Sequence, residues 1–295
     1  MSIEKWIMEN TSSLAGKKIA VTGSTGGLGR ELCRYLASLG ADLFLIDRNQ
    51  VASEQHAKCL TSSFPRISVT RICADLEDID SVKRAIEILG QEGIDVFIHN
   101  AGAYSIPRHK CKTGFDNVFQ INFASPYYMI RELLPILRQR CGGVVVVGSI
   151  AHNYSKIDVN DIDFGTCRAA SLVYGNAKRY LMFALFELFK NEDGAALAIT
   201  HPGITFTNIT AHYPKVIFAI IKHPMKVIFM SPRRAALCIL KGVFESCNYC
   251  EWIGPRIFDV WGLPCKKTLH TCGHDEIKSI AKISEDVYER QKSTL

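Results

Sequence analysis

The chain has no run of about 18 or more consecutive apolar residues, so the sequence predicts no transmembrane helix. It also lacks the apolar core of a secretory signal, because an acid, Glu4, already stands near the N-terminus. The net charge of +6 is spread over many Lys and Arg side chains, so no nucleic-acid footprint is indicated. From these absences we expect a cytoplasmic protein with no nucleic-acid partner.

Closely spaced cysteines of the disulfide-framework kind are also missing. The 11 cysteines are scattered over 295 residues, which favours reduced thiols. Cys247 and Cys250, followed by Cys265 and Cys272, have the spacing of a structural zinc site. Residues of a strand near 249–253 would alternate between two faces, which argues against such a site. The prediction is therefore no metal, with the alternative left open for these four thiols.

What is present is a regular alternation of apolar runs and amphipathic stretches, without a composition break or repeat. It predicts one α/β domain over 1–295, with a doubly wound, mostly parallel sheet of seven strands and helices on both faces. The predicted strands are Lys18–Thr22, Asp42–Ile46, Ser68–Ile72, Asp95–His99, Gly143–Val147, Ala196–Thr200 and Tyr249–Ile253. The predicted helices lie near 28–39, 50–62, 79–91, 113–140 and 173–190. Residues from about 261 to 295 are less regular, and we expect an appended tail there.

A glycine-rich turn follows the first predicted strand and opens a helix. Glycine lets backbone approach a phosphate closely, and the N–H groups of the helix N-terminus favour an anion. The segment Thr22–Gly29 therefore predicts a dinucleotide site. Its candidate binding residues are Gly23, Ser24, Thr25, Gly27, Leu28 and Gly29.

A tyrosine and a lysine stand four residues apart on a predicted helix, at Tyr174 and Lys178. They share one face of that helix. A free tyrosine has a pKa of ~10 and is a poor acid/base near neutral pH. A nearby ammonium stabilises the phenolate, so we expect Lys178 to lower the pKa of Tyr174.

Together, the glycine turn and the Tyr-x-x-x-Lys pair resemble the short-chain dehydrogenase/reductase family, which has a Rossmann-type fold. The resemblance covers roughly residues 15 to 255 and implies an enzyme that moves a hydride between a nicotinamide cofactor and an alcohol or ketone. It implies catalytic roles for Asn122, Ser149, Tyr174 and Lys178. It also implies cofactor contacts from Asp75, Leu76, Asn100, Ala101, Gly102, Tyr174, Lys178, Pro202, Gly203, Ile204 and Thr207. The chain departs from the family pattern at His99, where an asparagine is more common.

The end of the second predicted strand bears on the choice of cofactor. Asp47 stands near the offset at which an acid binds the ribose hydroxyls of NAD, and its charge would repel the 2′-phosphate of NADP. Arg48 would do the opposite. We expect Asp47 to govern, which favours NAD over NADP.

Two segments bear on the substrate. The stretch between Ser149 and Tyr174 contains an insert near 151–163 that resembles the branch of retinol dehydrogenases and hydroxysteroid dehydrogenases. A second, apolar segment at 213–231 lies within a predicted lid, about 205–235. Three readings stay open for it, namely a lid over a lipophilic substrate, a peripheral membrane contact and core packing. A steroid, a retinoid-like compound or another lipid alcohol or ketone is the expected substrate.

The helix near 173–190 is apolar on more than one face, which indicates burial on more than one side. With the helix near 113–140, it predicts the interface of a homodimer or homotetramer. The alternative to an enzyme is a dinucleotide-binding regulatory or scaffold protein with the same fold and no turnover.

Overall fold

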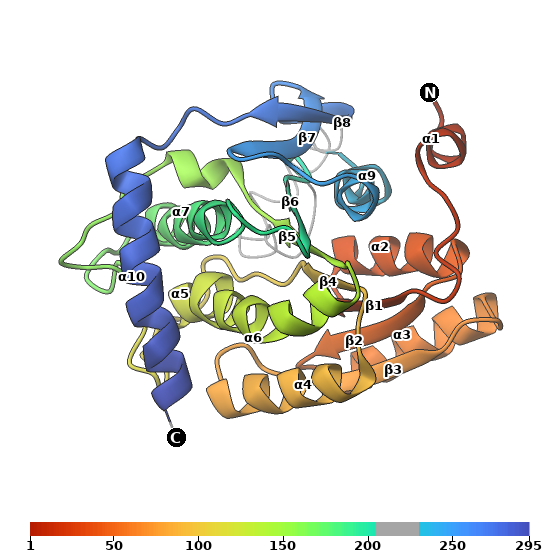
Figure 1. The fold of residues 1–295 in the computed structure, drawn as a ribbon, viewed down its shortest axis with the longest axis horizontal. Helices are drawn as coiled ribbons and strands as arrows, with labels where there is room; N and C mark the ends of the chain where they lie inside the picture. Colours follow the sequence, from red (N-terminus) through yellow and green to blue (C-terminus); the bar gives the residue numbers. More distant parts are fainter. Residues whose placement is uncertain (205–229, 295) are drawn as a thin grey trace, which may run out of the picture.

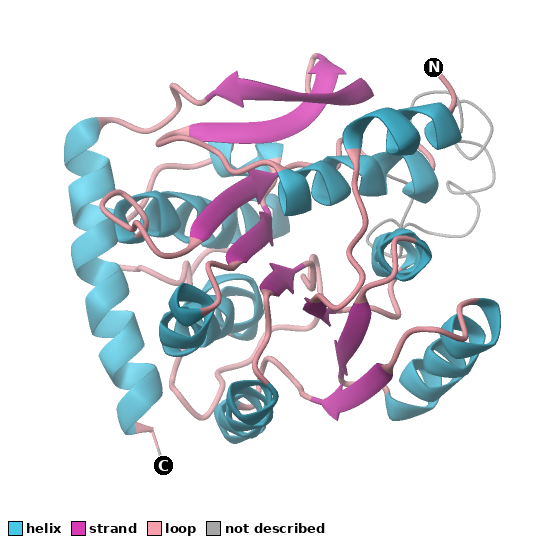
Figure 2. Ribbon diagram, turned by 45° about the vertical axis from the view of Figure 1, so that its right-hand side comes forward, coloured by secondary structure: helices cyan, strands magenta, loops and turns pink. Residues whose placement is uncertain are grey.

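The structure is a computed structural model that describes residues 1–204 and 230–294. In this part of the chain eight strands form one sheet in the order β3-β2-β1-β4-β5-β6-β7-β8 (Figures 1 and 2). They are β1 (Lys18–Thr22), β2 (Asp42–Asp47), β3 (Val69–Cys73), β4 (Val96–His99), β5 (Gly143–Val147), β6 (Ala196–Thr200), β7 (Glu251–Ile257) and β8 (Trp261–Thr268). The first seven strands are parallel, and β8 pairs with β7 in the antiparallel sense. The predicted doubly wound sheet is confirmed, but its strand count of seven is corrected to eight.

Helices cover both faces because adjacent residues of each apolar strand point to opposite sides. Ala20 and Val146 pack in one core cluster, whereas Val21 and Val145 pack in the other. The second cluster joins the sheet to α1 (Ile3–Asn10), α2 (Gly27–Ser38), α3 (Gln50–Ser63) and α9 (Pro232–Phe244). The first cluster joins it to α4 (Ile79–Glu92), α5 (Asn117–Phe119), η1 (Gln120–Ala124), α6 (Ser125–Gln139), α7 (Ala170–Leu188) and α10 (His274–Ser293).

The strand order positions the candidate site. β1 and β4 are neighbours in the sheet. After β1 the chain continues to β2 on one side, and after β4 it continues to β5 on the other side. Ligands of open parallel sheets bind outside the carboxyl ends of the strands at such a switch point. The glycine turn follows β1 and Asn100 follows β4, which puts both at this edge.

The residues after 261 are not an irregular tail. They form β8 and then α10, which lies across one end of the molecule beside α7 (Figure 1). The amide of Gln291 on α10 is buried against Gln120, with 2.9 Å between the Gln120 nitrogen and the Gln291 oxygen. Arg131 on α6 forms an ion pair with Glu285 on α10 at 2.6 Å.

This position removes the argument from uncovered apolar helix faces on which the predicted subunit interface rested. The sequence assigned the exposed faces of the helices near 113–140 and 173–190 to a partner subunit. In the structure, α10 of the same chain packs on α6 and α7. The apolar residues that seemed to require a partner, such as Leu181 and Phe183, belong to the core shared with Ile277 and Ile280 of α10.

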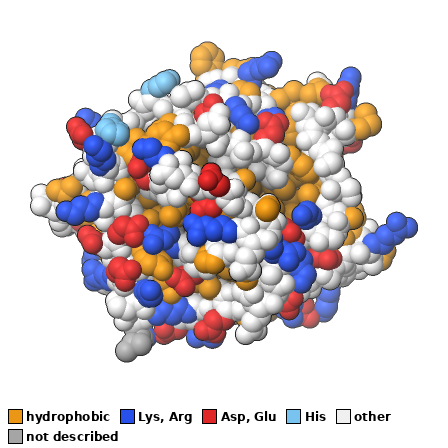
Figure 3. Space-filling view, in the orientation of Figure 1, with side chains coloured by type: hydrophobic (Ala, Val, Ile, Leu, Met, Phe, Trp, Pro, Cys, Tyr) orange, Lys and Arg blue, Asp and Glu red, His pale blue; other side chains and the backbone are white. Residues whose placement is uncertain are grey.

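No described helix is both long enough and apolar enough to span a membrane. On the face shown in Figure 3, acidic and basic side chains alternate with apolar ones, and no large area of one charge is visible. The predicted lid and membrane segment, 213–231, lies almost wholly outside the described residues.

Candidate active site

The glycine turn is tight because backbone from two strands meets there. Gly23 adopts a φ of +66°, a conformation that glycine alone adopts easily, and a Cβ on it would lie 2.9 Å from the Cα of Ala101. A Cβ on Gly29 would lie 2.3 Å from the carbonyl oxygen of Gly23. The Asn100 amide spans the gap and donates to the carbonyls of Thr22 and Gly23 at 3.1 and 3.0 Å. The glycine turn and the segment Asn100–Gly102, which the resemblance assigns to one site, therefore meet.

Asp47 also reaches this turn, although in an unexpected orientation. Its carboxylate is 4% exposed and accepts hydrogen bonds from the Ser24 hydroxyl at 2.5 Å and the Ser53 hydroxyl at 3.1 Å. The backbone N–H and the hydroxyl of Thr25 donate to its other oxygen at 3.1 and 3.0 Å. Both oxygens thus hold the glycine turn. The Arg48 side chain is 68% exposed beside them.

The residues that the resemblance assigns to cofactor contact after β3 lie at the same edge. Asp75 is half-buried and accepts from the backbone N–H of Glu77 at 3.0 Å, and Leu76 is buried. His99 is fully buried at the end of β4, where its Nδ1 lies 3.2 Å from the Thr22 hydroxyl. Burial holds the pKa of His99 well below its usual range, so the ring is neutral.

Ser149, Tyr174 and Lys178 are brought together from β5 and α7. Ser149 follows β5 and caps the short 3₁₀ helix η2 (Ile150–Asn153), whose Ala151 N–H donates to its hydroxyl at 3.2 Å. The Tyr174 hydroxyl is hydrogen-bonded to Ser149. Lys178 is 1% exposed, and its Nζ lies 5.7 Å from the centroid of the Tyr174 ring. One tyrosine, one serine and one buried lysine therefore form a single cluster.

The acid/base strengths in this cluster differ from the sequence-based expectation. Burial raises the pKa of Tyr174, and the hydrogen bond to Ser149 offsets part of this rise. The resulting pKa is about 12. Burial lowers the pKa of Lys178 to about 7. Its Nζ donates to the Val147 carbonyl at 2.9 Å rather than to the phenol. In the protein by itself, desolvation therefore outweighs the lysine charge, and the expected lowering of the tyrosine pKa is absent.

Asn122 lies beside this cluster in a π-helical stretch, η1. Its side-chain nitrogen donates to the carbonyls of Ala103 and Val118 at 2.8 Å each, and its oxygen accepts from the Ala103 N–H at 3.3 Å. Pro126 has no N–H to give the carbonyl of Asn122, which favours the wider turn. The helix thus ties Asn122 to the loop that follows Gly102.

The segment after β6 completes the described edge. Pro202 is buried, and Gly203 has a φ of +76°. The carbonyl of Ile204 accepts from the Met230 N–H at 3.1 Å. Thr207 and the rest of the predicted lid up to residue 229 lie outside the described residues.

Residues 17–160 match the model of the family described as short chain dehydrogenase. An uncharacterized oxidoreductase of Schizosaccharomyces pombe is 26% identical over 256 residues, which are 81% of this chain and 76% of the relative. Retinol dehydrogenase 12 of Mus musculus is 27% identical over 202 residues. The matched part of the chain, residues 17–160, is thus similar to the short-chain dehydrogenase/reductase family.

The fold agrees with this assignment. A solved structure of a putative uncharacterized protein from Mycobacterium paratuberculosis has a TM-score of 0.70 at 23% identity, covering 97% of this chain and 96% of that one. The aligned part of retinol dehydrogenase 12 is 67% of this chain and 64% of that enzyme. The match therefore spans a little under two thirds of the length of that relative.

The residues present fit the nicotinamide dinucleotide that this family binds. α2 begins at the glycine turn, where its N-cap residue, Gly26, has no side chain to cap the first N–H groups. These groups suit a pyrophosphate. The Lys178 ammonium is buried with one protein acceptor among the described residues, Val147 O, which leaves donors for ribose hydroxyls.

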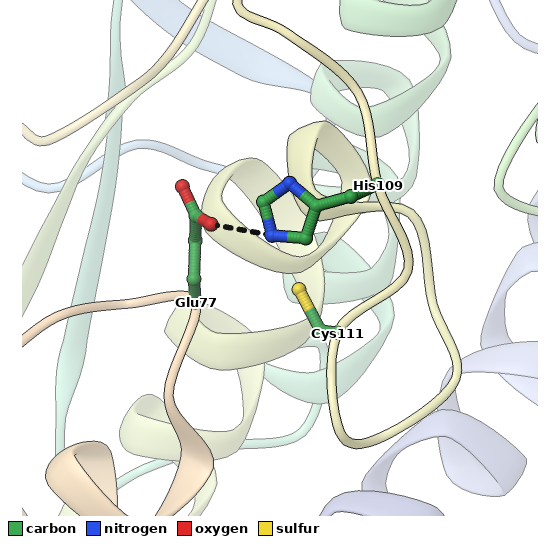
Figure 4. Close-up of side chains that lie close together, drawn as sticks. All are labelled: Glu77, His109 and Cys111. Atoms are coloured by element: carbon green, nitrogen blue, oxygen red, sulfur yellow. Dashed lines mark ion pairs between the residues drawn. The ribbon is translucent and has the colours of Figure 1, made fainter.

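One group of potential metal ligands occurs among the described residues, and it is not the cysteine set considered from the sequence. Figure 4 shows Glu77, His109 and Cys111, whose ligand atoms lie within 4.8 Å of one another. His109 Nε2 is 3.0 Å from Glu77, and Arg48 approaches the same carboxylate at 3.8 Å. The carboxylate is thus already paired, and we assign no metal. Within the described part of the chain, Cys247, Cys250, Cys265 and Cys272 form no comparable group of three ligands.

The sequence did not point to Arg179 and Glu276, which hold the turn that follows Ser149. Arg179 directly follows Lys178 on α7, and its guanidinium is 2% exposed. Its carboxylate partner is Glu276 on α10. The sequence offered one signal, a cation within a helix that is otherwise nearly all apolar. Its partner stands 97 residues later, and no local pattern links the two.

Proposed function

We propose that the protein is an NAD(P)(H)-dependent oxidoreductase that transfers a hydride between a nicotinamide cofactor and a lipophilic alcohol or ketone. The observation that supports it most is the cluster in which Tyr174 is hydrogen-bonded to Ser149 and lies over the buried Lys178. A dinucleotide-binding protein without turnover would use Lys178 for the cofactor ribose, but it has no need of Ser149 and Tyr174 placed beside that lysine.

Each residue has a role in this reaction. Ser149 binds the substrate oxygen, and Tyr174 exchanges a proton with it. In the oxidation direction a bound nicotinamide would accept the hydride from the substrate carbon, and the Tyr174 oxygen would take the hydroxyl proton. Lys178 holds the ribose and places positive charge near that oxygen, and Asn122 fixes the loop beyond Gly102. Bound oxidised cofactor supplies the second positive charge that favours the phenolate.

The choice between NAD and NADP follows from Asp47 and Arg48. The expected preference for NAD required an outward-facing Asp47 carboxylate. Four hydrogen bonds instead hold that group against Ser24, Thr25 and Ser53. Arg48 is the exposed charge at this edge, and a guanidinium binds a phosphate well. We therefore propose NADP(H) as the preferred cofactor and Asp47 as the residue that shapes the glycine turn.

The lipophilic substrate is proposed on two grounds. The insert between Ser149 and Tyr174 resembles that of the retinol dehydrogenase branch, and a relative carries the name retinol dehydrogenase 12. The apolar segment 213–231 would cover such a substrate, and it could also bring the protein to a membrane surface. A steroid, a retinoid-like alcohol or another lipid carbonyl fits this class.

The test is a redox screen of steroids, retinoids and aliphatic carbonyls with both cofactors, read by cofactor absorbance at neutral and alkaline pH. Tyr174→Phe serves as the matched variant, because it removes only the proton-transferring oxygen. We expect turnover by the wild type and a loss of about 10²–10⁴-fold in the variant, with cofactor binding retained. A variant that keeps half of the wild-type kcat would refute the role of Tyr174. Cofactor binding without turnover on any substrate would favour the regulatory alternative.

The sequence-based prediction of a homodimer or homotetramer rested on apolar helix faces that α10 covers. We propose a monomer, in which one catalytic domain over 1–295 carries its lid within 205–235.

A further inference from the structure

The C-terminal segment supplies a buried carboxylate to the helix that carries Tyr174 and Lys178. Arg179 Nε lies 2.7 Å from Glu276 Oε1, and one terminal nitrogen lies 2.7 Å from Glu276 Oε2. The Arg179 side chain is 3% exposed and that of Glu276 is 17% exposed, so water screens this pair little. It joins α7 directly to the first turn of α10, and the two helices lie side by side in Figure 1.

The same guanidinium also holds the turn behind Ser149. Its other terminal nitrogen donates to the His152 carbonyl at 2.9 Å, and the nitrogen shared with Glu276 donates to the Thr271 carbonyl at 2.7 Å. Arg179 thus connects the chain on both sides of the site, from η2 to the segment just before α10. A planar guanidinium with fixed donors suits such a junction.

His152 provides a second link to Ser149. Its Nδ1 lies 2.6 Å from the Ser149 carbonyl oxygen, and its Nε2 lies 2.8 Å from the Thr271 hydroxyl. A carbonyl only accepts, so Nδ1 carries the hydrogen and Nε2 accepts from Thr271. The ring is fully buried and stands edge-on to Trp252, with 5.5 Å between the ring centroids.

Glu276 reaches the insert as well. Its Oε1 accepts from the backbone N–H of Ile157 at 3.2 Å. One carboxylate therefore joins α7, α10 and the insert near 151–163. A buried ion pair is weak evidence for stability, because apolar residues of similar size often replace such a pair without loss. The geometry points instead to control over the position of neighbouring groups.

We propose that Arg179 and Glu276 are positioning residues, which hold the Ser149 turn in its catalytic geometry through His152 and Thr271. The inference rests on the proposed function of Ser149. It makes the segment Thr271–Glu276 part of the active-site support. Misplacement of a catalytic group by about 1 Å can lower the rate about 10²-fold, so loss of this support should appear in kcat.

The main variant is Glu276→Gln, which keeps the size of the side chain and removes its charge. The matched control is Glu285→Gln, which disrupts the Arg131 ion pair on the same helix, away from Ser149. We expect Glu276→Gln to lower kcat by about tenfold or more, with cofactor Kd changed less than about twofold. The control should keep its kcat. Equal losses in the two variants would overturn the inference.

Two further variants test the route through Ser149. In a Ser149→Ala background, Glu276→Gln should lower kcat much less than it does in the wild type, since the group being positioned is gone. An undiminished loss would show that Glu276 does not act through Ser149. Thr271→Val, a milder change, removes the hydroxyl that donates to His152. It should lower kcat about threefold or more, even if Glu276→Gln does not fold; an unchanged kcat would count against the proposal.

Hydrogen exchange tests the same link without any substrate. The backbone N–H groups of Ala151 and Ile157 bond to Ser149 and Glu276. Exchange in the peptide that spans them should become faster in Glu276→Gln and stay as in the wild type in Glu285→Gln. Unchanged exchange in Glu276→Gln would overturn the inference. Faster exchange in a protein that turns over no substrate would support the link to the turn and contradict the proposed function.

Discussion

Replacing Lys178 with methionine should stabilise the protein near neutral pH while abolishing its turnover. Burial lowers the pKa of this lysine from 10.5 to about 7, so the fold disfavours the charged form. At pH 7 the unfolded chain holds the proton firmly and the folded chain holds it about half the time. The difference disfavours folding by about 4 kcal/mol.

Methionine keeps the apolar stem and removes the amine. The variant loses the hydrogen bond to the Val147 carbonyl and leaves that oxygen unsatisfied, which costs about 1–3 kcal/mol. A net gain of about 1–3 kcal/mol remains, which corresponds to several degrees in Tm. Because the lysine pKa is lowered on folding, the penalty is full below pH 7 and fades as the pH rises toward about 10.4. The gain should therefore be clear at pH 6.5, and at pH 10 the lost hydrogen bond should outweigh it, so that the variant is up to about 2 kcal/mol less stable than the wild type.

The assay is thermal unfolding without cofactor at both pH values, for wild type, Lys178→Met and Lys190→Met. Lys190 follows the same helix and has a side chain that is 45% exposed, so its replacement should produce no comparable change with pH. The reasoning is refuted if Lys178→Met unfolds at a lower temperature than the wild type at pH 6.5. It is also refuted if the stabilisation is the same at pH 10.

Arg48→Ala should lower kcat/KM for NADP(H) about tenfold or more and barely change it for NAD(H), since the ion pair with the 2′-phosphate is lost; a wild-type preference for NAD(H) would contradict this. Phe218→Ser and Ile221→Ser should raise KM for a bulky lipophilic substrate about tenfold and affect a small soluble carbonyl less, whereas equal losses with a lowered Tm would indicate core packing. Light scattering at micromolar concentration should give the mass of one chain, and a stable dimer would show that another surface associates.

The central strands were predictable because burial on both faces leaves an unbroken apolar run. Gly143–Val147 and Ala196–Thr200 match β5 and β6 at both ends. β8 was missed because Lys266 and Lys267 interrupt its apolar pattern and it pairs on one side only. α10 was missed because its low content of apolar residues resembles a solvated tail. Its buried face consists of a few residues, such as Ile277, Ile280 and Val287.

The site was predictable to the extent that its signals are local. The glycine turn and the Tyr174–Lys178 pair lie within short segments; the turn follows β1, and Lys178 bonds to the last residue of β5. The role of Asp47 was not predictable in this way, because the carboxylate orientation depends on Ser53, a helix residue that faces it. Arg179 and Glu276 were out of reach for the same reason, since only the folded chain brings them into contact.

The placement of α10 also has a consequence during synthesis. The buried pair Gln120–Gln291 joins positions 171 residues apart, so α5, η1 and α6 emerge from the ribosome long before their final cover exists. Until the last residues of the chain are released, the apolar and amide groups that α10 will bury stay open to solvent or to another nascent chain. A stop codon ahead of α10 would leave that surface exposed permanently. Such a product should depend on chaperones and accumulate in the insoluble fraction even though every residue proposed to bind the cofactor has been made.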